Sequence, residues 1–129
     1  MLFLDVRCFC PIPTAMKYLL LLYEHKQRLV QRGFDDWTLR TEANRVGDEL
    51  LQMSGRLLSG AQLQAADTVV TLSHQHDCVL VTAGPLAEIT TQLNAFYLIE
   101  AHDLNAALQM AAQLPQVQYS SIEVRPIAE

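Results

Sequence analysis

The chain has 129 residues, half of them apolar, and a formal net charge of −5. This length and composition suffice for one domain with a core of ordinary size. Its nine Lys and Arg residues are scattered, which argues against a nucleic-acid surface because such surfaces need clustered basic side chains. The apolar run 19–22 is far shorter than the roughly 20 residues of a membrane-spanning helix, so we expect no membrane partner.

The three cysteines, Cys8, Cys10 and Cys78, leave an odd thiol, and no signal-peptide pattern precedes them. We therefore expect a reducing, cytoplasmic location. Residues 1–15 lack a regular period, and a regular pattern begins at Met16. We expect an N-terminal extension over 1–15 and a domain over 16–129. Met16 is a candidate for the natural start, with Met1 as the alternative.

In chain order, residues 17–23 are nearly all apolar, which predicts a central strand with both faces covered. Apolar residues at three- and four-residue steps between Trp37 and Leu57 predict a helix that begins near Asp35 and Asp36 and ends at Gly55 or Gly60. An extended conformation over residues 56–59 is the alternative at its end. Residues 68–73 and 78–82 predict a hairpin, and residues 93–100 another strand. Asp103 is the expected N-cap of a helix through Ala112, before a last strand over 119–125.

This order predicts an α+β fold with a ferredoxin-like antiparallel sheet and two helices on one face. On strand 93–100 we expect Leu93, Ala95, Tyr97 and Ile99 on one side, and Phe96 and Leu98 on the other. The second face therefore carries apolar side chains that the two helices cannot cover. We expect a second copy to cover it, sheet against sheet, as a homodimer.

Four segments resemble the YCII-related family in its DGPF-domain branch: residues 16–23, 79–88, 96–100 and 123–126. The resemblance implies a dimeric α/β barrel, in which two sheets face each other and leave a cleft. It also implies a connection with extracytoplasmic-function sigma factors. The Asp and Phe that name the branch are replaced here by Ala83 and Leu86, which puts an inherited activity in doubt.

Six residues are candidates for a ligand site in such a cleft: Gly84, Pro85, Glu88, Tyr97, Glu123 and Arg125. A carboxylate held in an apolar cleft can act as a general base, so Glu88 and Tyr97 are the weak catalytic candidates. The structural alternative is that Glu88 begins a helical turn, Tyr97 packs in the dimer core, and Glu123 and Arg125 pair at the surface. We favour this alternative.

Metal and cofactor motifs are weak, and we expect neither a metal nor a cofactor. His74 and His76 lie where a turn is expected, and no third ligand can be named. Cys8 and Cys10 lack a second pair, and Cys78 is typical of a small buried hydrophobe. Some distant relatives use a His-Asp pair with the His on the first helix, but no His lies between residues 35 and 59.

Two functions follow from these observations. The first is a dimeric domain that is non-catalytic or binds a small molecule or a regulatory protein. The second is a small-molecule lyase, isomerase or cofactor-free oxygenase that works in the dimer cleft. Fold alone does not decide between them.

Overall fold

The computed structural model describes residues 16–33, 37–85 and 91–128. Within these ranges the main feature is a four-stranded antiparallel sheet with strand order β3-β6-β2-β7. Its strands are β2 (Met16–His25), β3 (Leu57–Gln62), β6 (Thr91–Ala101) and β7 (Ser120–Pro126). Strand β2 lies between β6 and β7, so the predicted central strand is confirmed, and the fold is α+β.

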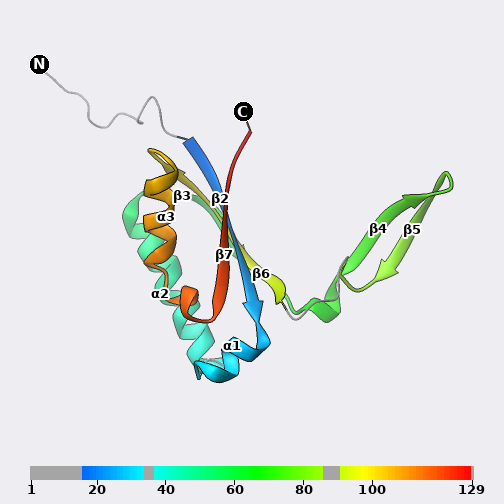
Figure 1. Ribbon diagram of the computed structural model, residues 1–129, viewed down its shortest axis with the longest axis horizontal. Helices are drawn as coiled ribbons and strands as arrows, with labels where there is room; N and C mark the ends of the chain where they lie inside the picture. The colour runs from blue at the N-terminus through cyan, green and yellow to red at the C-terminus, as the bar shows by residue number, and fades with distance from the viewer. Residues whose placement is uncertain (1–15, 34–36, 86–90, 129) are drawn as a thin grey trace, which may run out of the picture.

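Helices cover one face of this sheet (Figure 1). They are α1 (Lys26–Gln31), α2 (Trp37–Ser54) and α3 (Leu104–Ala112), with a 3₁₀ turn η2 (Pro115–Gln118) before β7. Alternate residues of β2, Tyr18, Leu20 and Leu22, are buried beneath them together with Ala95, Tyr97 and Ile99 of β6. This alternation is expected for a sheet with a core on one side.

None of the helices in the described residues lies on the other face of the sheet (Figure 1). Its apolar side chains come from the two middle strands, and five of the six are partly buried while the sixth, Leu93, is 38% exposed. We call this set the open face: Leu19, Leu21, Tyr23, Leu93, Phe96 and Leu98.

A β-bulge in β6 corrects the predicted position of Leu93. Leu22 pairs with Ala95, but the next residue, Tyr23, pairs with Leu93, so Asn94 is the extra residue. One extra residue reverses the side of every residue beyond it. Leu93 therefore lies on the open face with Tyr23, and not beside Ala95 as the alternation predicts.

The helices differ from the prediction mainly at their ends. Helix α2 ends at Ser54, so Gly55 and not Gly60 follows its end, and β3 opens at Leu57 within the segment expected as extended. Helix α1 is a third helix that the sequence analysis does not predict, because its six residues contain too few apolar positions to display a period. The Asp103 cap is confirmed, since its carboxylate accepts a hydrogen bond of 2.9 Å from the amide of Ala106.

The predicted hairpin is present as β4 (Val70–Gln75) and β5 (Cys78–Ala83), preceded by a 3₁₀ turn η1 (Ala66–Thr68). His76 and Asp77 form its turn with φ of 50° and 64°, as the expected turn position requires. The hairpin projects from the side of the sheet opposite the helices (Figure 1). Cys78 is consequently exposed, so its predicted burial is wrong.

The described helices are all too short or too polar to span a membrane.

Candidate functional site

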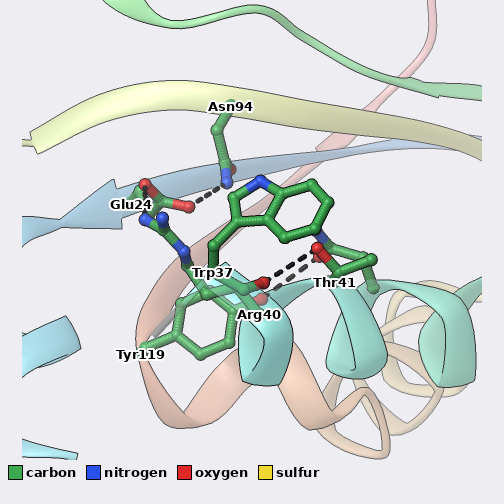
Figure 2. A network of polar contacts seen from close by, with 7 residues as sticks. Glu24, Trp37, Arg40, Thr41, Asn94 and Tyr119 are labelled. Carbon is green, nitrogen blue, oxygen red and sulfur yellow. Dashed lines mark hydrogen bonds and ion pairs between the residues drawn. The ribbon is translucent and has the colours of Figure 1, made fainter. Parts of the chain in front are cut away.

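A group of polar side chains lies at one end of the helix-covered face, where apolar packing stops. Glu24 of β2 accepts a hydrogen bond of 2.6 Å from Asn94 Nδ2 and forms an ion pair of 3.4 Å with Arg40 of α2. Tyr119 donates a hydrogen bond of 3.1 Å to Asn44 Oδ1. We call these five residues the Glu24 cluster; Figure 2 shows four of them around the start of α2.

Three elements bring the Glu24 cluster together. Glu24 continues the alternation of Leu20 and Leu22 along β2, so its carboxylate faces the helices. Arg40 and Asn44 are four residues apart on α2 and therefore share one side of that helix. The bulge in β6 supplies Asn94 to the same face.

Trp37 lies on the same side of α2, one turn before Arg40. It is the first residue of the helix and is 70% exposed. Its carbonyl accepts a hydrogen bond of 2.8 Å from Thr41 Oγ1 (Figure 2). An exposed indole beside half-buried polar groups is a ring on which a planar ligand can stack.

Two buried polar atoms flank Glu24 without a hydrogen-bond partner among the described residues. They are Asn94 Oδ1 on β6 and Ser120 Oγ on β7. Ser120 is opposite Glu24 in the register of β2 and β7, and it is 1% exposed. Buried polar atoms are normally paired, so a molecule that offers hydrogen bonds gains most at these two atoms.

The environment of Tyr119 favours its neutral phenol. Tyr119 is fully buried, and its pKa is raised to about 12, mainly because burial disfavours the charged phenolate. The carboxylate of Glu24 also contributes to this rise in the pKa, while the guanidinium of Arg40 opposes it. Tyr119 is therefore a hydrogen-bond donor at neutral pH and not a base.

A second polar group surrounds Tyr97 in the interior. The Tyr97 hydroxyl donates to Asp48 and accepts hydrogen bonds from Gln62 Nε2 at 3.2 Å and Gln116 Nε2 at 3.1 Å. Burial raises the pKa of Tyr97, and the hydrogen bond to Asp48 raises it further. These bonds join β6 to α2, β3 and η2, which is the pattern of a buried structural tie.

The structure separates the predicted site residues. Tyr97 is 2% exposed beneath the helices, whereas Glu123 and Arg125 pair with Leu21 and Leu19 on the opposite side of the sheet. Glu123 and Arg125 form an exposed ion pair of 3.8 Å. Within one chain Tyr97 thus does not meet them.

The Gly-Pro segment begins at the base of the hairpin. Gly84 has φ of 102°, a conformation that favours glycine, and its amide donates to the carbonyl of Val69 at 2.7 Å. Pro85 follows and is partly buried. The prediction for Glu88 lies outside the described residues, as do those for Cys8 and Cys10.

Sequence reasoning missed the Glu24 cluster, although one signal was present. Glu24 is a charged residue at a core-facing position of the strand that starts at Met16. Such a residue needs a buried partner. Asn94 could not be found in this way, because its position depends on a bulge that the alternating pattern conceals.

No three His, Cys, Asp or Glu side chains within 16–33, 37–85 and 91–128 are grouped so that they could hold a metal ion. His74 lies within β4, which ends at Gln75, so its expected place in the turn is wrong, whereas His76 opens the hairpin turn as expected.

Comparison with known proteins identifies a family and one relative. The model of the YCII-related domain matches residues 16–129. An uncharacterized protein of Rhizobium meliloti (strain 1021) is 39% identical over 77 residues, which cover 58% of this chain. The match spans 62% of that relative, so it covers less than two thirds of the relative's length.

Proposed function

This chain belongs to the YCII-related domain family, and on that premise we propose that it is a dimeric module that binds a small polar molecule at the Glu24 cluster. The observation that carries the binding proposal is the pair of buried, unpartnered atoms on either side of Glu24, Asn94 Oδ1 and Ser120 Oγ. Asn94 Oδ1 can only accept a hydrogen bond, and Ser120 Oγ can accept or donate. The favoured ligand therefore carries hydrogen-bond donors, as an amine or a phenol does.

The dimer proposal is supported by the open face. The element order, apart from α1 and the inserted hairpin, is strand, helix, strand, strand, helix, strand, with strand order β3-β6-β2-β7. That arrangement supports a ferredoxin-like sheet. Six apolar side chains on a face that none of the described helices covers favour a second sheet as their cover, as in a dimeric α/β barrel.

Catalysis in the dimer cleft receives no support from Tyr97. Its hydroxyl already has three hydrogen-bond partners and faces the helices. The role of Glu88, the membership of the DGPF branch and the link with sigma factors stay predictions from the resemblance.

The binding proposal is tested by a thermal-shift screen of small amines, phenols and acids. Binding to the folded state adds RT ln(1 + [L]/Kd) to stability, so we expect one of these classes to raise the melting temperature. The shift should disappear in Asn94→Ala and persist in the control Glu123→Gln, whose side chain is at the exposed edge strand. Each variant is compared with its own ligand-free melting temperature. A shift that survives Asn94→Ala, or a screen in which no compound shifts the wild type, contradicts the proposed site.

A further inference from the structure

The β4–β5 hairpin has one apolar side that nothing in the described chain covers. Register pairs Val70 with Ala83 and Leu72 with Val81, and Val79 follows on the same side opposite His74. The other side carries Thr71, Ser73, Gln75, Thr82, Leu80 and Cys78. We call the first set the arm face: Val70, Leu72, Val79, Val81 and Ala83.

The arm face is exposed to an extent that is unusual for apolar residues. Val70, Leu72, Val79 and Val81 are each between 62% and 67% exposed. A two-stranded hairpin is only marginally stable in water when nothing packs on it. Contiguous exposed apolar patches of this kind mark interaction surfaces. The arm face therefore needs a cover.

From these observations we propose that the hairpin is an arm that clasps the second copy of the chain in the dimer, with its arm face packed on the partner's flank. This inference rests on the homodimer of the proposed function. The hairpin projects on the open-face side of the sheet, which is where the partner's sheet would lie (Figure 1). Position therefore favours a second copy over an unrelated protein.

The length of the arm suits this contact. Six residues in each strand span about 20 Å at about 3.3 Å per residue, while packed sheets lie about 10 Å apart. An arm that leaves the sheet on its open side thus extends beyond the plane of the partner's sheet. Its apolar side can then lie against the partner's flank.

The area that a stable dimer needs gives the second argument. Four strands about 4.8 Å apart, over five residues of about 3.3 Å, give the whole side of the sheet that has the open face at its middle a footprint of about 300 Å². Stable interfaces bury about 800 Å² per partner. Each arm face offers about 200 Å² by the same dimensions, and each copy also supplies the surface that receives the other arm. The sheet side, the chain's own arm face and the surface that receives the partner's arm together give a footprint of about 700 Å² per copy. This is close to the area of about 800 Å² that each partner buries in a stable interface.

The test compares two matched leucines in the full-length chain. Leu72 lies on the arm face, whereas Leu80 lies on the opposite side of the same hairpin and is 47% exposed. Sedimentation equilibrium should give a dimer dissociation constant at least ten times weaker for Leu72→Ser, and within two-fold of wild type for Leu80→Ser. Neither side chain belongs to the described core, so the fold should survive both changes.

A cross-link gives a second measurement that does not depend on those variants. Cys78 is exposed on the hairpin and becomes the single thiol after Cys8→Ser and Cys10→Ser. A photo-activated cross-linker on Cys78, in a mixture of ¹⁵N-labelled and unlabelled chains, should join one labelled to one unlabelled chain.

The outcomes separate the arm from the dimer. A wild-type dimer whose dissociation constant is unchanged by Leu72→Ser, with cross-links only within chains, overturns the arm and leaves the homodimer standing. A wild type that is monomeric overturns the homodimer and the arm together. Cross-links between chains together with the ten-fold loss for Leu72→Ser support the arm.

Discussion

Gly47 is packed closely against Gln116. For this reason we expect Gly47→Ala to destabilise the chain, although glycine to alanine in a helix usually stabilises it. A Cβ at Gly47 would lie 2.2 Å from Gln116 Oε1, and Gln116 is fully buried and bonded to Tyr97. Gln116 therefore cannot move aside without breaking that bond. Tyr97, the weak catalytic candidate for which the sequence favoured a packing role, is tied to this contact by the hydrogen bond from Gln116.

Gly47→Ala tests this packing. A glycine in a helix interior normally gains about 1 kcal/mol on substitution by Ala, but overpacking costs about 1 to 3 kcal/mol. We expect a net loss of stability in urea unfolding. In a Gln116→Ala background the same change should become neutral or favourable. A Gly47→Ala chain that is more stable than wild type contradicts the account.

Tyr119 gives a prediction about alkaline pH. Its pKa in the folded chain is about 12, above the ordinary value of 10.0, so the folded state holds the phenolic proton more tightly than the unfolded state. This contribution is present in full below pH 10 and is lost as pH rises to about 12. The rise in the pKa of Tyr119 from 10.0 to about 12 corresponds to about 3 kcal/mol of unfolding free energy at most.

We expect the unfolding free energy of wild type to fall between pH 10 and pH 12, and Tyr119→Phe to reduce that fall. Tyr97 shares the direction of shift, so part of the fall remains in this variant. Phenolate absorbance during a pH titration gives an independent measure of both groups. If Tyr119→Phe keeps the whole wild-type slope, the buried environment described for Tyr119 is wrong.

At the scale of elements, the N-terminus of α3 is stabilised by the side chain of its N-cap residue, Asp103. The Asp103 carboxylate pairs with the amide of Ala106, which would otherwise lack a partner within the helix. Helix α3 in turn buries Ala107 and Ala111 against the core. This cap was predictable because it depends only on neighbouring residues.

Asp103→Ala should lower the unfolding free energy by about 1 kcal/mol, as loss of an N-cap usually does. Asp103→Ser restores an accepting oxygen and should recover most of the loss. Asn105→Ala, in the exposed first turn of α3, is the control and should change little. Urea unfolding followed by circular dichroism measures all three, and equal stability of Asp103→Ala and wild type would exclude the cap as a stabilising contact.

The elements also mark the limit of the sequence pattern. Strand β2, the hairpin and helices α2 and α3 follow from alternation, period and local turn residues. The bulge at Asn94 does not, because it is set by pairing with β2 across about 70 residues of chain. The same bulge moves Leu93 to the open face and brings Asn94 to Glu24, so one unpredicted residue changes both the surface and the site.

At the scale of the whole molecule, apolar residues on both faces of β2 and β6 were enough to predict a second sheet face that needs cover. The projection of the hairpin away from the sheet was not predictable. The alternation of side chains along β4 and β5 does not indicate whether any other part of the chain packs on them. Cys78 was expected to be buried because it begins a strand, but it is exposed because that strand belongs to the projecting hairpin.

A single charged substitution tests whether the open face is the dimer interface. Leu21 lies near its centre, and Leu21→Glu would place a carboxylate in the proposed interface without a partner. We expect this variant to be monomeric with unchanged circular dichroism. Leu108→Glu is the matched control, since Leu108 is 47% exposed on α3, away from the open face. A dimer that tolerates Leu21→Glu as well as Leu108→Glu would show that its interface lies elsewhere.

Sedimentation equilibrium of the wild-type chain most directly tests the proposal that two copies bury the open face between them. At micromolar concentration we expect a mass twice the 14.5 kDa of one chain. A mass of one chain under these conditions would contradict the claim, because the open face would then be stable in water without a partner.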